Sequence, residues 1–227
     1  MTDYPIPNVS NDLSGRVALV TGTTSGLGRR FAQVIAAAGA KVAVTGRRID
    51  RLEALAAEIN AAGGHALPIQ LDMQDNDSIL NCVNQAEREL GTIDILVNNA
   101  GIPDAQRAHK MSLDLIDSVF DTNLRGPYVL SCEIARRLIA AEQPGRMINI
   151  SSVGGFNYGG NGAALYSITK SAIVRMTECL AVEWARYNIN VNAIAPGAFS
   201  SEMMDGMMGR DRARVCHQSV PAENPWG

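Results

Sequence analysis

Tyr166 and Lys170 lie four residues apart in a segment with a helical pattern, and this pair gives the first indication of chemistry. Residues at this spacing share one face of a helix, so the ammonium can act on the phenol. A tyrosine loses its proton near pH 10 and serves as an acid or base at neutral pH only when a cation stabilises its phenolate. The Ser151-Ser152 pair upstream adds two hydroxyl groups. The same spacing also occurs in ordinary amphipathic helices, so the pair alone predicts no activity.

The second chemical feature is a glycine-rich turn between a strand pattern and a helix pattern. Residues 16–21 form a short apolar run, Gly22 to Gly28 follow directly, and residues 29–38 carry apolar side chains at helical spacing. Free amides and the helix dipole favour an anion at a helix N-terminus, and glycines allow close approach of the backbone. The turn therefore predicts a pyrophosphate site, with a plain tight turn as the alternative. Its spacing is Thr-Gly-x-x-x-Gly-x-Gly rather than Gly-x-Gly-x-x-Gly.

Strand and helix patterns alternate along the rest of the chain. The expected strands are residues 42–45, 66–71, 93–97, 147–150 and 189–194. The expected helices are residues 50–60, 76–90, 112–141 and 163–187, with Gly126-Pro127 as the point of interruption of the first long one. This alternation predicts an α/β fold with a Rossmann-like, doubly wound parallel sheet and helices on both faces. Ligands bind beyond the carboxyl ends of such strands, which is where the polar motifs fall.

Length and composition place limits on the organisation of the chain. With 227 residues and 46% hydrophobic content it can bury one substantial core. We expect a single catalytic domain over residues 1–227, with an irregular N-terminal arm at 1–13, a substrate lid at 198–209 and an irregular tail at 210–227.

Charge and targeting signals exclude several partners. The net charge of −3 is spread over both signs without a basic block, so we expect no nucleic-acid partner. No apolar stretch approaches the roughly 20 residues that span a bilayer, and the N-terminus lacks a signal core. We therefore expect no membrane partner and a cytoplasmic location. The four cysteines are scattered and form no Cys-x-x-Cys pair, so we expect neither a metal site nor a disulfide framework.

Taken together, these motifs resemble those of the short-chain dehydrogenase/reductase family of nicotinamide-dependent enzymes. The shared motifs extend from residue 16 to about residue 203 and comprise Thr21-Gly22 through Gly28, Asp72, Asn98-Asn99-Ala100-Gly101, Asn123, Ser152, Tyr166-x-x-x-Lys170 and Pro196-Gly197. The resemblance implies an oxidoreductase that transfers a hydride between NADP(H) and a carbonyl or secondary alcohol.

The resemblance also implies a role for each catalytic residue. Tyr166 would be the general acid and base, and Lys170 would lower its pKa and bind the nicotinamide ribose. Ser152 would polarise the substrate oxygen, with its neighbour Ser151 as the rival. Asn123 would hold a water that relays protons to Lys170, or would instead satisfy backbone groups at a break in a helix.

On the cofactor side, the resemblance implies that Asp72 binds the adenine amino group, although it could equally cap the following helix. Gly46 stands where NAD enzymes carry an acidic residue, and the Arg47-Arg48 pair that follows suits a 2′-phosphate. NADP is therefore favoured over NAD, while the alternative is that both arginines are simply solvated. The expected cofactor-binding residues are Gly22, Thr24, Ser25, Gly26, Leu27, Gly28, Arg47, Asp72, Met73, Asn99, Ala100, Gly101, Tyr166, Lys170, Pro196, Gly197, Phe199 and Ser201.

The substrate is indicated only by apolar side chains. Phe156 and Tyr158 follow Ser152, and four methionines, Met203, Met204, Met207 and Met208, lie in the expected lid. These residues favour an apolar substrate, with a methionine stripe that covers the core as the alternative.

The C-terminal part of the chain departs from the family pattern. Family members usually continue with a further helix and a seventh strand, for which residues 210–227 show no periodicity. We therefore expect a sheet without the seventh strand and an exposed sixth strand. The two long helices, around residues 114–140 and 163–187, favour a homodimer, and a tetramer is less favoured. The alternative function is a catalytically silent dinucleotide-binding or assembly protein.

Overall fold

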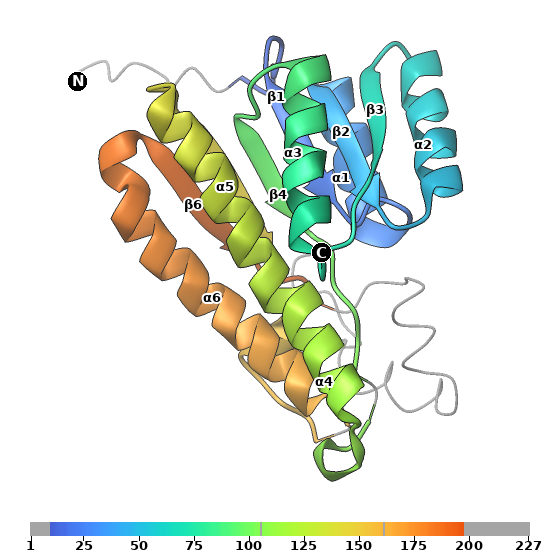
Figure 1. The fold of residues 1–227 in the computed structure, drawn as a ribbon, viewed down its shortest axis with the longest axis vertical. Helices are drawn as coiled ribbons and strands as arrows, with labels where there is room; N and C mark the ends of the chain where they lie inside the picture. Colours follow the sequence, from blue (N-terminus) through green and yellow to red (C-terminus); the bar gives the residue numbers. More distant parts are fainter. Residues whose placement is uncertain (1–9, 105, 161, 198–227) are drawn as a thin grey trace, which may run out of the picture.

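The chain folds around one parallel β-sheet (Figure 1). The computed structural model describes residues 10–104, 106–160 and 162–197. Within them the sheet has six strands in the order β3-β2-β1-β4-β5-β6, and every neighbouring pair is parallel. The strands are β1 (Val17–Thr21), β2 (Lys41–Gly46), β3 (His65–Gln70), β4 (Ile95–Asn98), β5 (Gly145–Ile150) and β6 (Ile189–Ile194). The predicted Rossmann-like, doubly wound fold is confirmed.

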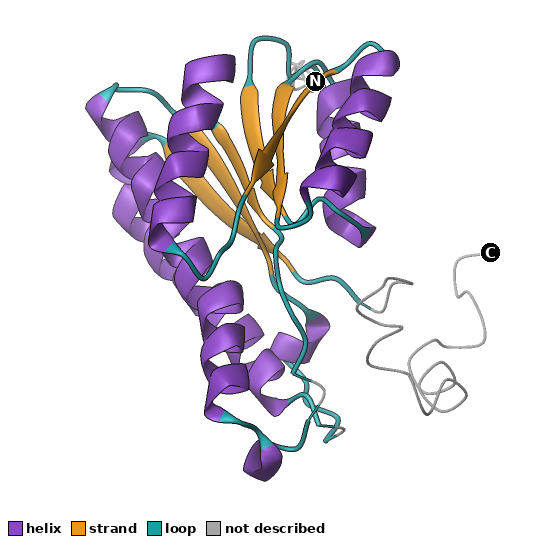
Figure 2. Cartoon of the chain, turned by 45° about the vertical axis from the view of Figure 1, so that its right-hand side comes forward, coloured by secondary structure: helices purple, strands orange, loops and turns teal. Residues whose placement is uncertain are grey.

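Helices cover both faces of the sheet (Figure 2). Ala18 and Val20 of β1 pack in one core cluster with α1 (Gly26–Ala37) and α2 (Ile49–Ala61). The alternate residues Val17 and Leu19 pack in a second cluster. The helices of the second cluster are α3 (Asn76–Leu90), α5 (Gly126–Ala140) and α6 (Ala164–Trp184). Successive side chains of a strand point to opposite faces, so an apolar strand such as β1 serves both cores.

The first long helix does not end at Gly126-Pro127; its hydrogen-bond pattern changes there and the helix continues. It comprises α4 (Leu113–Phe120), a π-helical turn η2 (Asp121–Arg125) and then α5. The Gly126 amide donates to the Asp121 carbonyl, and Pro127 has no amide to donate. The predicted interruption is therefore a π-helical turn, and the helix continues through Pro127.

Smaller differences occur at element ends. α1 begins at Gly26, inside the glycine-rich turn, rather than at residue 29, and β4 begins at Ile95 rather than at residue 93. The predicted lid, the tail, Phe199 and Ser201 lie outside the described residues. In the part of the chain that the structure does describe, no helix is both long and apolar enough to cross a bilayer.

Candidate active site

The predicted site residues gather at the carboxyl edge of the sheet. The glycine-rich turn follows β1, Arg47 follows β2, and Asp72 lies two residues beyond the end of β3. Asn99 follows β4, Ser152 follows β5 closely, and Pro196 lies just beyond β6. All strands are parallel, so these ends meet at one edge of the sheet.

The glycine-rich turn packs directly against the turn after β4. Gly22 has a φ of +70°, and a Cβ there would come within 2.8 Å of the Ala100 Cα. A Cβ on Gly28 would lie 2.3 Å from the Gly22 carbonyl oxygen. The Asn99 side-chain amide donates to the Thr21 carbonyl at 2.9 Å and to the Gly22 carbonyl at 3.2 Å. Asn99 therefore holds the turn in shape, and both glycines are required by close approach.

The N-terminus of α1 suits an anion. Ser25 occupies the N-cap position, but its side chain makes no capping hydrogen bond. The first turn of α1 carries no acidic side chain. The amides of Gly26, Leu27 and Gly28 therefore face the turn without a capping side chain, which is the donor arrangement that binds a phosphate.

Arg48, rather than Arg47, reaches the glycine-rich turn. Its guanidinium donates to the Thr24 hydroxyl at 2.6 Å. The exposed Arg47 contributes a backbone carbonyl that accepts from the Gln70 side chain at 3.1 Å. A Cβ on Gly46 would lie 3.2 Å from the Thr24 methyl carbon, so the end of β2 has little room for a larger side chain. The sequence analysis named Arg47 as a cofactor-binding residue. The contact of Arg48 with Thr24 is seen only in the folded chain.

Asp72 is not the cap of the helix that follows it. Its Oδ1 accepts from the Gln74 amide at 3.0 Å, and its own amide donates to the Ser78 hydroxyl at 3.0 Å. Asp75 caps α3 instead, by accepting from the Asp77 amide at 2.9 Å. The alternative interpretation of Asp72 as a helix cap is therefore wrong.

Met73, expected at the cofactor, belongs to the core. Its side chain is only 4% exposed and lies in the cluster formed with α3, α5 and α6. A Cβ on Gly126 would come within 2.5 Å of the Met73 carbonyl oxygen. Met73 therefore packs against the start of α5, and its side chain contributes to the core.

Tyr166 and Lys170 share one face of α6, as their spacing predicts. The Lys170 Nζ lies 5.6 Å from the centroid of the Tyr166 ring and donates to the Ile150 carbonyl at 2.7 Å. Lys170 is 4% exposed, and burial lowers its pKa to about 8.

The expected lowering of the Tyr166 pKa is not found. Burial raises the pKa of the phenol, a hydrogen bond with Ser152 offsets part of this effect, and the charge of Asp104 adds to it. The main physical reason is that the phenol loses contact with water, which disfavours the phenolate.

Ser152 faces Tyr166, whereas Ser151 is structural. The Ser152 hydroxyl lies close enough to the phenol to lower its pKa, and it accepts from the Gly154 amide at 3.0 Å. The Ser151 hydroxyl is buried and donates to the Lys170 carbonyl at 2.8 Å. Ser152 is therefore the serine that can reach a group bound beside Tyr166.

Two further serines, which the sequence analysis did not single out, attach the loop of Ser152 to α6. The hydroxyls of Ser167 and Ser171 donate to the carbonyls of Gly154 and Gly155 in the short helix η3 (Val153–Gly155). A Cβ on Gly155 would lie 2.9 Å from the Lys170 carbonyl carbon, so the loop fits only with glycine there.

Asn123 lies in the π turn and satisfies backbone groups. Its Oδ1 accepts from the Ile102 amide at 2.8 Å, and its Nδ2 donates to the Ile102 carbonyl at 2.9 Å. Nδ2 also lies 3.3 Å from the Thr169 hydroxyl. A Cβ on Gly101 would lie 3.4 Å from the Asn123 Oδ1 and 3.5 Å from the Lys170 Nζ. The Asn123 and Lys170 side chains therefore converge on Gly101.

Comparison with known proteins decides the family. Residues 16–210 match the family model described as short chain dehydrogenase. The chain belongs to the short-chain dehydrogenase family. This short-chain dehydrogenase is an oxidoreductase that acts on alcohol and carbonyl groups, as its relatives do.

Two curated relatives and one solved structure illustrate the similarity. The dehydrogenase is 36% identical over 217 residues to 2-dehydro-3-deoxy-D-gluconate 5-dehydrogenase of Dickeya dadantii, a match that covers 95% of this chain and 84% of that protein. It is 39% identical over 192 residues to a 3-oxoacyl-[acyl-carrier-protein] reductase of Aquifex aeolicus, which covers 84% and 77%. A putative NAD(P) dependent gluconate 5-dehydrogenase from Beutenbergia cavernae with bound NADP superposes with a TM-score of 0.82 at 35% identity, over 89% and 80% of the two chains.

Asp104 is the buried charged residue that the sequence analysis missed. Its Oδ2 accepts from the amides of Leu165 at 2.8 Å and Tyr166 at 3.1 Å. These amides belong to the first turn of α6, whose N-cap residue Ala163 has no capping side chain. About 60 residues separate Asp104 from the helix that it caps, so no local pattern could reveal the contact.

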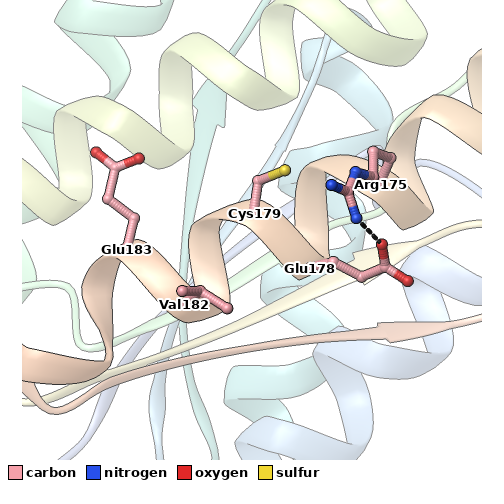
Figure 3. Close-up of a pocket in the computed structure, with 5 residues that line it drawn as sticks. All are labelled: Arg175, Glu178, Cys179, Val182 and Glu183. Carbon is pink, nitrogen blue, oxygen red and sulfur yellow. Dashed lines mark hydrogen bonds and ion pairs between the residues drawn. The ribbon is translucent and has the colours of Figure 1, made fainter.

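An open hollow lies along α6 (Figure 3). The described residues that line it are Arg175, Glu178, Cys179, Val182 and Glu183. Arg175 and Glu178, one helical turn apart, form an ion pair at 2.8 Å (Figure 3). No predicted catalytic or cofactor residue is among these five, so the hollow is part of the outer surface of α6.

Proposed function

We propose that this short-chain dehydrogenase transfers a hydride between NADP(H) and a carbonyl or secondary alcohol, with Tyr166 as the general acid and base. The observation that carries the proposal is the approach of the Ser152 side chain to the Tyr166 phenol, next to the buried Lys170 and on the same sheet edge as the glycine-rich turn. The bound dinucleotide supplies or accepts the hydride.

Tyr166 and Ser152 would act on the same substrate oxygen. In reduction the phenol donates its proton to the carbonyl oxygen while the Ser152 hydroxyl donates a hydrogen bond to it. In oxidation the phenolate takes the proton of the alcohol. The raised pKa of Tyr166 keeps the phenol protonated at neutral pH, which supports its use as a proton donor.

Lys170 and a water held by Asn123 would carry the proton from Tyr166 towards solvent. Both side chains approach Gly101, and Pro127 leaves the Asn123 carbonyl without an α-helical donor four residues on. The pKa of Lys170, lowered to about 8, makes proton exchange through its amine feasible near neutral pH.

We further propose NADP as the preferred cofactor, held by the glycine-rich turn, Asp72, the backbone of residues 99–101 and the loop of Pro196-Gly197. Arg48 beside Thr24 and the exposed Arg47 place two cations at the end of β2, and Gly46 leaves no acidic side chain there. The bound NADP of the Beutenbergia cavernae structure supports the same preference. Comparison of kcat/KM for NADPH and NADH tests it, and a preference for NADH would refute it in favour of NAD.

We propose an apolar carbonyl substrate. Phe156 and Tyr158 are 64% and 54% exposed close to Ser152, and they offer aromatic surface beside the reacting oxygen. The two curated relatives are named for a sugar acid and for 3-oxoacyl chains, so both classes belong in the test. Loss of NADPH absorbance over a panel of ketones, 3-oxoacyl thioesters and keto sugar acids measures the preference. Turnover of the sugar acids alone would refute the apolar assignment.

We propose a homodimer in which α5 and α6 form the interface, with a tetramer less favoured. Tyr128 on α5 is 49% exposed, and Ile168 and Val182 on α6 are 56% and 81% exposed, which is costly for large apolar side chains in water. The hollow in Figure 3 adds a surface into which a partner helix can pack. Sedimentation of wild type and Val182→Glu tests this: we expect a dimer that the substitution dissociates, and a wild-type monomer would contradict it.

A further inference from the structure

We propose that Asp104 is a positioning residue for Tyr166: its carboxylate fixes the backbone that carries the phenol and places a negative charge beside it. The inference rests on the proposed role of Tyr166 as the acid and base. It adds a residue outside the Asn123, Ser152, Tyr166 and Lys170 set.

The first step of the argument is the cap of α6. The leading amides of a helix have no intrahelical acceptor, and Ala163 at the N-cap offers none. Asp104 Oδ2 accepts from both Leu165 and Tyr166, at 2.8 and 3.1 Å. One of the two bonded amides therefore belongs to the residue whose phenol does the proposed chemistry.

The second step is the burial of the carboxylate. Asp104 is 2% exposed, and its other oxygen, Oδ1, is buried with no hydrogen-bond partner in the described residues. A carboxylate whose second oxygen has neither water nor a donor beside it is poorly shielded, and its charge acts strongly on its neighbours. After burial of the phenol itself, the charge of Asp104 is the other cause that raises the pKa of Tyr166.

The third step concerns the other charges around the start of α6. Lys170, a cation on the same helix face, lies 5.6 Å from the Tyr166 ring centroid. The remaining titratable or charged side chains on the described elements that pack there are exposed or half-buried, and comprise Arg107, His109, Lys110, Asp114, Asp117, Asp121 and Arg125. Among these side chains, Asp104 is therefore the buried acidic one, and its charge acts on the Tyr166 phenol in the opposite sense to that of Lys170.

The fourth step is the position of Asp104 in the loop after β4. Two residues earlier, the backbone of Ile102 makes two hydrogen bonds to the Asn123 side chain. The same loop thus holds Asn123 through Ile102 and Tyr166 through Asp104. It links the end of β4, where the cofactor would bind, to two of the four proposed catalytic residues.

Titration of Tyr166 tests the proposal without any need for turnover. Protein labelled with ¹³C at the tyrosine Cζ is titrated by NMR, and Tyr166→Phe identifies the Tyr166 resonance by its loss. Asp104→Asn keeps an acceptor for the two amides but removes the charge. We expect the midpoint of the Tyr166 titration, and the pH profile of kcat/KM for alcohol oxidation, to move to lower pH. Asp75→Asn makes the same change at the cap of α3 and is expected to move neither.

Each result of this experiment decides a different claim. Asp104→Ser, also a neutral acceptor, serves if Asp104→Asn does not fold. An unmoved Tyr166 midpoint in a folded variant would overturn the role of Asp104, even if the enzyme is active. A midpoint that moves in an enzyme without hydride transfer would support Asp104 and refute the proposed function. If neither Asp104 variant folds while Asp75→Asn does, Asp104 serves only the fold and the proposal fails.

Discussion

Replacement of Lys170 by methionine gives the most quantitative prediction from this structure. The Lys170 amine is 4% exposed, and burial lowers its pKa from 10.5 to about 8. This lowering means that the folded protein holds the charged form at a cost of about 3 kcal/mol below pH 8. Methionine has a similar length and no charge, so Lys170→Met removes that cost. It also leaves the Ile150 carbonyl without its donor, which costs about 1–3 kcal/mol at any pH.

The pH dependence separates these two effects. Between pH 8 and 10.5 the unfolded chain binds a proton at Lys170 that the folded protein has lost, so wild-type stability from this residue rises with pH. Below pH 8 both states are protonated and this contribution is constant. We therefore expect Lys170→Met to be close to wild type in stability at pH 6.5 and less stable at pH 10, with the difference changing by about 2–3 kcal/mol.

Urea unfolding of wild type and Lys170→Met at pH 6.5 and pH 10 measures this change. Lys41→Met is the matched control, because Lys41 on β2 is an exposed lysine. If the stability difference for Lys170→Met is the same at both pH values, Lys170 is not held in a low-dielectric site and the electrostatic reasoning is wrong.

Three further predictions follow from the geometry of the cofactor turn and the helix caps. Gly28→Ala places a Cβ 2.3 Å from the Gly22 carbonyl oxygen, so we expect NADPH binding, followed by fluorescence, to weaken at least tenfold, and unchanged binding would contradict the proposed turn. Arg48→Ala removes the cation at Thr24, and we expect KM to rise more for NADPH than for NADH; an equal rise would count against its contact with the 2′-phosphate. Asp75→Ala removes the cap of α3 and should lower the free energy of unfolding by about 1 kcal/mol, as measured by urea titration, whereas a neutral result would mean that the Asp77 amide finds another acceptor.

The elements were predictable where the local pattern and the tertiary environment agree. Residues 76–90 carry apolar side chains at helical spacing and an aspartate before them, and α3 has these bounds. The change at Gly126-Pro127 was predicted at nearly the right place, but as an interruption of the helix rather than as a change in its hydrogen bonds. A proline in a helix interior usually breaks the pattern, whereas here the Gly126 amide moves to the Asp121 carbonyl and the helix continues.

The site was predictable as a set of residues and much less as a set of contacts. The predicted edge of the sheet does bring together Tyr166, Lys170 and Ser152. The direction of the Tyr166 pKa was wrong, because the charge pairing is visible in the spacing and the burial of the phenol is not. Asp104 and Arg48 depend on contacts between segments that are about 60 and 24 residues apart, and no periodicity encodes such contacts.

Transfer of deuterium from NADPH labelled at C4 to the product carbon, compared between wild type and Tyr166→Phe, tests the central claim most directly. We expect wild type to place deuterium on the product alcohol for at least one carbonyl of the panel. Tyr166→Phe is expected to transfer it about 10²–10⁴ times more slowly, because the proton donor is lost, while NADPH binds as before. Equal rates for the two proteins, or no transfer by either while NADPH still binds, would contradict the assignment of Tyr166 as the proton donor.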